Sequence, residues 1–427
     1  MKRPTHDCGR ASAPIFRPAL AWALCALAGC TVGPDYERPA LAASSGYSQA
    51  PLPESTAAAA VAAGAAQRLA LTQDIQADWW TLFRSPALNA LIERAFAANP
   101  DIEAAQAALR VAQENVAAQR GFFFPTVQAD YTPMRSKIAG NLGGNSPGIQ
   151  GDGSVIETYA GTPRSEGGTA PFNGPVIYNF HTAQLTVGFV PDLFGANRRQ
   201  VESLQAEAEF QRLQLEAAYI TLASNVVAAA IQEALLRRQI ASVDAIIDGR
   251  RQSVALAQRQ QRAGYASRLD LALQENALAQ ARQLLPALER QFEQTRALLR
   301  ALLGATQDSE LPETFELDAL QLPEALPLTL PSRLVEQRPD VRAAEALLRS
   351  ANAQVGVATA AMLPQISLDG AVGGAASHFD QMLWKSGKFF DLEANISQPL
   401  FAGGTLLHRN ARRNRRGAWR RRSTAPL

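Results

Sequence analysis

Residues 98–130 read ANPDIEAAQAALRVAQENVAAQRGFFFPTVQAD, and residues 337–369 read QRPDVRAAEALLRSANAQVGVATAAMLPQISLD. The two stretches align without a gap at an offset of 239 residues, and eleven of the 33 aligned positions are identical. The shared positions include both prolines and the aspartate after the first one, which chance matching of two Ala-rich helices does not explain. We therefore predict an internal duplication.

Each copy predicts a helix followed by two strands. The first proline and the aspartate suit a helix start, an amphipathic stretch of about 22 residues follows, and the second proline ends it. Alternating residues then predict a first strand pair at 126–131 and 184–191, and a second pair within 365–369 and 392–401. The Gly- and Pro-rich segment 132–181 suits an exposed loop at a barrel rim.

A long helical hairpin is predicted over residues 196–303. Apolar residues recur there at three- and four-residue steps, and Pro286 is the first proline. The one break reads RAGYASRLD at 262–270, where Gly264 can adopt a left-handed conformation and Ser267 can cap the next helix. The first helix would have roughly 65 residues and a length of about 100 Å.

The first 29 residues have the pattern of an export signal. A basic segment precedes an apolar run from Ala19 to Ala28, and this run is far shorter than the roughly 20 residues of a membrane span. The following LAGC at 27–30 resembles a bacterial lipobox, in which Cys30 receives a diacylglycerol and an N-acyl chain and becomes the mature N-terminus. A plain secretory signal with a chance cysteine, or a short core helix, are the alternatives.

Composition and motifs exclude several classes of function. Of the three cysteines only Cys30 survives such cleavage, so no disulfide is available. The four histidines (His6, His181, His378 and His408) form no catalytic or metal pattern, and the chain has no CxxC, HExxH, P-loop or GxSxG motif. The missing motifs argue against an enzyme. Outside the signal and the Arg-rich end the chain is acidic, so we expect no nucleic-acid partner.

The order of the motifs resembles the TolC-like outer-membrane efflux protein family, and within it the NodT-like lipoprotein branch. The lipobox is followed by VGPDY at 32–36, WW at 79–80, the two Pro-Asp helices, DLFG at 192–195 and AGYASRLD at 263–270. The resemblance covers residues 22 to about 404. Thr31, which is not the aspartate of inner-membrane retention, favours the outer membrane.

This resemblance implies a mainly α fold with a small β part. A homotrimer would close a 12-stranded barrel in the outer-membrane lipid, with four strands from each protomer, above a helical tunnel. The implied function is passive export of small molecules. The implied partners are a periplasmic adaptor and an inner-membrane resistance-nodulation-division transporter. The implied adaptor contact is the hairpin tip: Ala263, Gly264, Tyr265, Ser267, Leu269 and Asp270.

The predicted organisation has five parts. They are a signal (1–29), a lipid-anchored arm (30–78), a first repeat (79–335, with an equatorial segment at 304–335), an incomplete second repeat (336–404) and an Arg-rich tail (405–427). A type I protein-secretion channel and a structural periplasmic lipoprotein are the alternative functions. No cofactor is expected besides the lipid on Cys30.

The tail departs from the family pattern, which continues into a second long hairpin. Eight arginines occur between Arg409 and Arg422, and the apolar periodicity ends. A frameshift, a truncated variant and a basic tail for nucleic acid or anionic lipid are the three interpretations. A frameshift would leave the tunnel wall incomplete and put the activity of this chain in doubt. Resequencing the gene across codons 400–427 and on past the stop, read in all three frames, distinguishes these interpretations.

Overall fold

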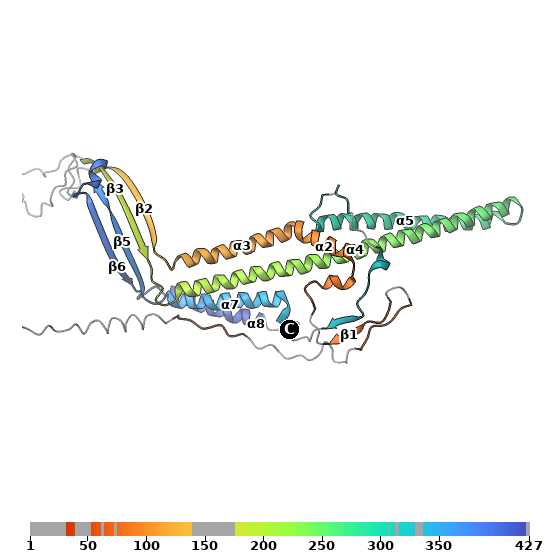
Figure 1. The fold of residues 1–427 in the computed structure, drawn as a ribbon, viewed down its shortest axis with the longest axis horizontal. Coiled ribbons are helices and arrows are strands. Elements are labelled where there is room, and N and C mark those ends of the chain that lie inside the picture. The colour runs from red at the N-terminus through yellow and green to blue at the C-terminus, as the bar shows by residue number, and fades with distance from the viewer. Residues whose placement is uncertain are drawn as a thin grey trace, which may run out of the picture. The chain divides into compact units, whose positions relative to one another are not determined.

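The computed structural model describes residues 31–38, 53–60, 64–71, 75–138, 176–306, 308–311, 316–328 and 336–423. The signal, Cys30 and residues 139–175 of the predicted loop lie outside the described residues. The chain divides into two compact units. The sheet unit comprises Met1–Tyr36, Asn115–Leu204 and Ser350–Ala418, and the helical unit comprises Glu37–Glu114, Gln205–Arg349 and Trp419–Leu427. Figure 1 labels their elements.

The sheet unit is built on four antiparallel strands in the order β2-β3-β5-β6. Their bounds are β2 Thr126–Ile138, β3 Val176–Phe189, β5 Gln365–Ala376 and β6 Lys388–Ser397. The short helix η4 (Phe379–Leu383) lies between β5 and β6 in the chain. The sheet therefore joins the strand pairs of both repeats through β3 and β5, which the sequence pattern alone did not specify.

The first strand pair is longer than predicted. We expected 126–131 and 184–191, but β2 continues to Ile138 and β3 begins at Val176. Pro133 belongs to the Gly- and Pro-rich segment 132–181 that we expected to be a loop, but in the structure it pairs in register with His181. Pro133 has no backbone N–H to donate, but the pairing of β2 with β3 continues on both sides of it, at Thr132–Thr182 and Met134–Phe180.

The repeat helices are equal in length. Helix α3 (Pro100–Gly121) and helix α7 (Pro339–Ala360) each have 22 residues and each begin at the predicted proline. Helix α2 (Pro86–Ala98) ends at Asn99, whose side-chain oxygen accepts a 2.9 Å bond from the backbone N–H of Asp101. Asn99 thus closes one helix and caps the next, so the two helices follow each other without a loop.

The predicted helical hairpin is present. Helix α4 (Ala196–Arg262) has 67 residues and helix α5 (Arg268–Leu302) has 35, and α5 continues through Pro286. They lie side by side (Figure 1), and Ile247 and Val254 of α4 pack against Leu278 and Ala281 of α5. Burial of these few apolar residues at helical spacing holds the hairpin together.

The main core of the helical unit gathers around α2 and α4. Leu88, Leu91 and Ile92 are almost completely buried and share one cluster with Val226. Edge-to-face ring contacts extend this cluster: Trp80 to Phe96 at 5.6 Å and Phe96 to Tyr219 at 4.9 Å between centroids. The short helix η1 (Trp79–Phe83) supplies the tryptophans of the WW motif, which therefore have a packing role.

Within the described residues, α4 also contains an 18-residue window with a mean hydropathy of 1.4, apolar enough for a membrane span. Half of that window is buried inside the protein. Leu222, Ala223 and Val226 of α4 belong to the main core. Core packing explains the apolar window, because a buried helix passes the same test.

Three smaller elements complete the described chain. Strands β1 (Arg68–Leu71) and β4 (Ala325–Leu328) form a parallel pair in the helical unit, and η3 (Leu317–Ala319) precedes β4. The Arg-rich tail forms helix α8 (Thr405–Ser423), although few of its residues are apolar. Arginine, alanine and leucine are strong helix formers, so intrinsic propensity favours a helix even with few apolar residues.

Candidate functional site

One face of the sheet is apolar and exposed. The register places Val127, Val187, Gly370 and Leu392 in one row, and Ala129, Leu185, Val372 and Phe390 in the next. The exposed apolar side chains of this face are Val127, Tyr131, Leu185, Val187, Leu368, Val372, Phe390, Leu392 and Ile396. Phe390 and Leu392 are each 84% exposed. An apolar surface that is continuous across four strands needs a covering medium or partner.

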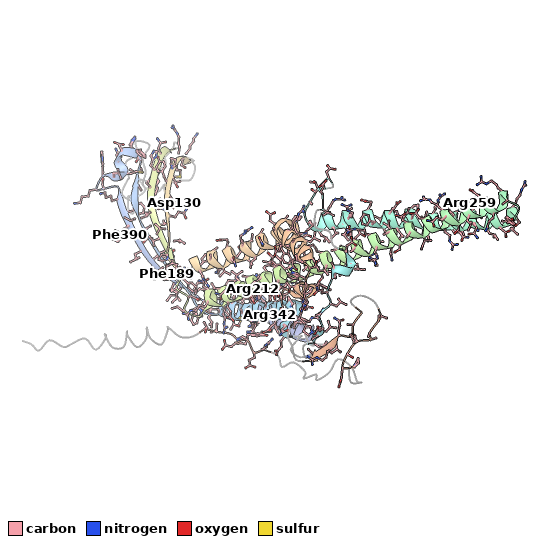
Figure 2. The ribbon with its side chains drawn as sticks, turned by 45° about the vertical axis from the view of Figure 1, so that its right-hand side comes forward. Asp130, Phe189, Arg212, Arg259, Arg342 and Phe390 are labelled. Carbon is pink, nitrogen blue, oxygen red and sulfur yellow. The ribbon has the colours of Figure 1, made fainter. Side chains whose placement is uncertain are left out.

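The opposite face is polar and acidic. Its rows include Gln128, Thr186 and Asp391, and next to them Asp369 directly opposite Glu393. Asp130 adds a fourth carboxylate from β2, and no Lys or Arg lies in these rows. Apolar side chains on this face include Phe389, opposite Gly373, and Met134, opposite Phe180. Figure 2 labels Asp130 and Phe390, which belong to opposite faces of the sheet.

Aromatic residues lie at both ends of the apolar face. At one end the Tyr131 hydroxyl and His181 Nδ1 form a 2.9 Å hydrogen bond, and Phe379 contacts both rings edge-on. At the other end Phe124 precedes β2 and Phe189 ends β3. His181 and Phe189 are eight residues apart on β3, which is about 27 Å of extended strand. This matches the roughly 25 Å apolar band with aromatic girdles of outer-membrane barrels.

Both edges of the sheet are open within the described residues. Strand β2 pairs only with β3, and β6 pairs only with β5. Unpaired backbone N–H and C=O groups cannot face lipid, because each would cost several kcal/mol. A single copy of this sheet therefore cannot be the complete membrane-spanning structure.

The hairpin tip has the predicted turn and cap. Gly264 has φ +81°, the Tyr265 N–H donates to Gln260 O at 2.9 Å, and the Gly264 N–H donates to Gln261 O at 3.0 Å. These are the two bonds of a Schellman motif. Ser267 then caps α5, because its hydroxyl accepts from the backbone N–H of Asp270 at 3.1 Å.

The Asp270 carboxylate completes a capping box. It accepts 2.9 Å and 2.8 Å bonds from the backbone N–H and the hydroxyl of Ser267. These bonds hold the pKa of Asp270 below its ordinary value, and the bond from the Ser267 backbone N–H contributes most. Of the other tip residues, Ala263 follows the last residue of α4, and Tyr265 and Leu269 are 87% and 68% exposed. The tip thus has a hydrogen-bonded turn and presents two large apolar side chains, Tyr265 and Leu269, to solvent.

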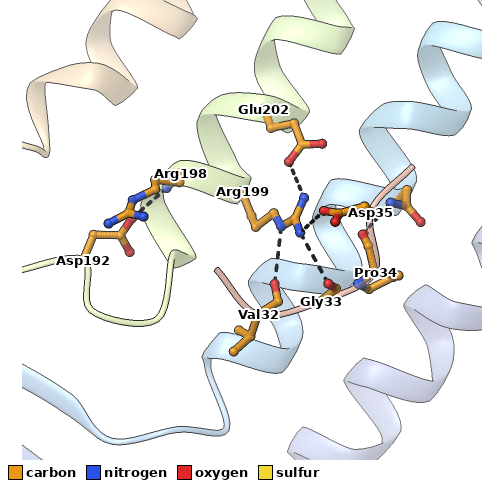
Figure 3. A network of polar contacts seen from close by, with 9 residues as sticks. Val32, Gly33, Pro34, Asp35, Asp192, Arg198, Arg199 and Glu202 are labelled. Carbon is orange, nitrogen blue, oxygen red and sulfur yellow. Dashed lines mark hydrogen bonds and ion pairs between the residues drawn. The ribbon is translucent and has the colours of Figure 1, made fainter. Parts of the chain in front are cut away.

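Sequence reasoning missed one cluster, at Arg199 near the start of α4. Its guanidinium binds Asp35, Glu202 and backbone oxygens of residues 32 and 33 (Figure 3). The side chain is only 7% exposed. An arginine among the first residues of a long helix gave no sequence signal of this role, because all its partners except Glu202 lie more than 160 residues away.

Comparison with known proteins supports the fold and the family. The family profile described as outer membrane efflux protein matches residues 91–305 and 330–424. The chain belongs to this family. The match extends through residue 424, beyond the limit of about 404 that the motifs indicated. Membership also supports the prediction that the chain is not an enzyme.

Relatives within the outer membrane efflux protein family are similar over most of the chain. The pyoverdine export outer membrane protein OpmQ of Pseudomonas aeruginosa is 28% identical over 337 residues, which are 77% of this chain and 64% of OpmQ. The probable efflux pump outer membrane protein TtgC of Pseudomonas putida is 28% identical over 384 residues, 89% of this chain and 71% of TtgC. The chain therefore spans less than two thirds of the length of OpmQ.

Solved structures show the same fold. The outer-membrane channel OprN superposes with a TM-score of 0.71 at 26% identity, covering 92% of this chain and 79% of OprN. The CmeC outer membrane channel of Campylobacter jejuni gives a TM-score of 0.73 at 17% identity, covering 92% of this chain and 76% of CmeC. The mainly helical fold with a small antiparallel sheet is thus the fold of known channels.

Proposed function

We propose that this chain is the outer-membrane channel subunit of a tripartite efflux system and conducts small molecules passively. The observation that carries the proposal is the two-faced sheet. Its exposed apolar face suits lipid, and its acidic face suits a water-filled lumen. A structural periplasmic lipoprotein without a channel would not need such a face.

The assembly would be a homotrimer. Three copies supply twelve strands, and joining β2 of one protomer to β6 of its partner leaves no sheet edge toward the lipid. A lipid on Cys30 would add an anchor in the outer membrane. A single acyl chain binds membranes only marginally, so a lipid with several chains meets the requirement for stable anchoring.

The partners would be a periplasmic adaptor at the hairpin tip and an inner-membrane transporter of the resistance-nodulation-division type. Support comes from the exposed Tyr265 and Leu269 on a capped turn, since rigid presentation of apolar side chains favours a docking contact. The names of OpmQ and TtgC refer to pyoverdine export and to an efflux pump. These names favour small-molecule export over type I protein secretion.

Chemical cross-linking of purified outer membranes, followed by planar-bilayer recording, tests the channel. We expect a cross-linking ladder that ends at three copies and stable conductance steps. Recovery of monomer alone after cross-linking, together with no conductance, would overturn the proposal. A photo-reactive residue at position 265, expressed with candidate adaptors, tests the tip, and the same residue at exposed position 246 of α4 is the matched control.

A further inference from the structure

The first described residues, 31–35 (TVGPD), are docked on the sheet unit by their backbone. The Val32 N–H donates to Phe194 O at 3.2 Å, and the Asn352 side-chain amide donates to Pro34 O at 2.8 Å. Phe194 lies five residues after the end of β3. The docked segment therefore lies beside the chain that leaves the base of the sheet.

Arg199 is the centre of this docking. Its Nε donates to Val32 O and one terminal nitrogen donates to Gly33 O, both at 3.3 Å, and that same nitrogen binds the Asp35 carboxylate at 2.7 Å. The other terminal nitrogen binds Glu202 at 2.8 Å. Burial lowers the pKa of Arg199, but its bonds to Asp35 and Glu202 raise it overall, so the cation persists. The neighbouring Arg198 points to Asp192 instead (Figure 3).

Three glycines make room for the docked residues 31–35. We call the surface that receives them, formed by Gly195, Arg199, Asn352 and Gly356, the slot. Gly33 has φ +105°, and a Cβ there would lie 2.5 Å from the Cα of Gly356. A Cβ on Gly356 would in turn lie 2.8 Å from Cγ of Arg199. Gly195, with φ +76°, leaves room for Thr31, whose methyl carbon would lie 2.5 Å from an added Cβ. Residues 31–35 therefore fit the slot only because positions 33, 195 and 356 are glycines, which have no Cβ.

The slot changes how Cys30 would be connected to the sheet. An undocked arm over residues 31–78 would behave as a tether with a root-mean-square length of about 40 Å. With residue 31 docked, only one peptide unit, about 3.8 Å between Cα atoms, separates the lipid-bearing residue from the slot. A shorter tether raises the effective concentration of the apolar face at the membrane.

We propose that Arg199 is a positioning residue that fixes where the lipid-modified Cys30 leaves the protein, so that the anchor holds the base of the sheet at the membrane and promotes insertion of the sheet. The inference rests on the proposed function, because it requires the lipid on Cys30. Arg199 needs no contact with the lipid. It acts through the backbone oxygens of residues 32 and 33.

The test uses the full chain in its host membrane with introduced cysteines. Lipid modification blocks Cys30, and Cys8 and Cys25 lie in the predicted signal, so an introduced thiol reports alone. Val32→Cys reports docking through its rate of maleimide labelling, and Leu392→Cys reports whether the apolar face is in lipid. Incorporation of labelled palmitate reports the anchor. Arg199→Ala and Gly33→Ala are compared with the matched control Arg198→Ala.

We expect Arg199→Ala and Gly33→Ala to keep the palmitate label but to speed labelling at position 32 by about tenfold or more, since the bonds of the buried guanidinium to residues 32, 33 and 35 are lost. Labelling at position 392 should also rise, and Arg198→Ala should behave like the parent. Because Gly33→Ala leaves the slot itself intact, agreement of the two variants excludes simple misfolding of the sheet unit.

Three results would overturn the inference. Unchanged labelling at position 32 in both variants would refute the docking role of Arg199. Fast labelling at position 32 with unchanged labelling at position 392 would refute the coupling to insertion. Absence of palmitate from the parent would refute the lipid anchor itself, whereas failure of the coupling alone would leave the proposed channel function standing.

Discussion

Adjacent positions of β5 give a sharp test of the two faces. Val372 lies on the apolar face between Leu185 and Phe390, and Ala371 lies on the polar face between Thr186 and Asp391. Arginine on the lipid side of a barrel costs about 2–4 kcal/mol near the midplane. Val372→Arg should therefore reduce the insertion equilibrium about 30- to 700-fold, because 1.4 kcal/mol corresponds to tenfold.

Ala371→Arg is the matched control. It adds the same charge one residue away, where Asp391 is the direct cross-strand neighbour, so we expect insertion to stay within a few fold of the parent. Both variants are exported and separated on a flotation gradient, and the fraction resistant to alkaline extraction is measured. Val372 is 55% exposed in the single chain, so loss of folding does not explain the difference. Equal insertion of the two variants would refute the assignment of the faces.

Three further predictions concern the helices. Gly264→Ala should weaken the hairpin tip by about 1–2 kcal/mol, because residue 264 has φ +81°. A new Cβ there meets nothing within 4 Å, so the cost is in the backbone alone, and it is measured as faster amide exchange at residues 263–270. The control Gly249→Ala, within α4, should instead stabilise its helix by about 0.5–1 kcal/mol. The lowered pKa of Asp270 means that its cap is fully formed above pH 3.8 and is lost as pH falls through the still lower folded value. The exchange difference between the parent and Asp270→Asn should therefore be constant from pH 7 to 4 and vanish in stronger acid, and a difference that vanishes near pH 6 would contradict this. Leu91→Ala should cost about 2–5 kcal/mol in thermal or denaturant unfolding, since Leu91 is 2% exposed in the main core, and a loss under 1 kcal/mol would refute the packing described.

The sequence predicted the elements whose signals are local. The repeated Pro-Asp starts fixed α3 and α7, and the Gly264 and Ser267 positions fixed the hairpin turn. The sequence did not predict the full length of the first strand pair, because Pro133 interrupts the pattern and because exposed strand ends need no apolar alternation. The helix α8 was also missed, since apolar periodicity reports burial rather than helix propensity.

Non-local contacts explain what else sequence reasoning could not find. The order β2-β3-β5-β6 depends on a pairing between β3 and β5, whose register joins Leu185 to Val372. Arg199 depends on backbone oxygens of residues far away in the chain. Backbone partners leave no trace in residue type, so a single sequence carries no signal for them. The glycines at positions 33, 195 and 356 are compatible with two backbone segments lying close together, but their sequence positions do not indicate which segments these are.

The parallel pair β1–β4 has a consequence for the order of folding. Arg68 pairs with Ala325, and the Gln67 side chain donates to Pro323 O across 256 residues. Strand β1 bonds locally to residues 54–56, but its parallel partner β4 becomes available only after the whole hairpin has been made and has folded back. Such a contact closes a very long loop and belongs to the slow, late steps of folding. Until then the edge of residues 68–71 that pairs with β4 stays open, and this open edge is where a protease or a chaperone would bind the unfinished chain.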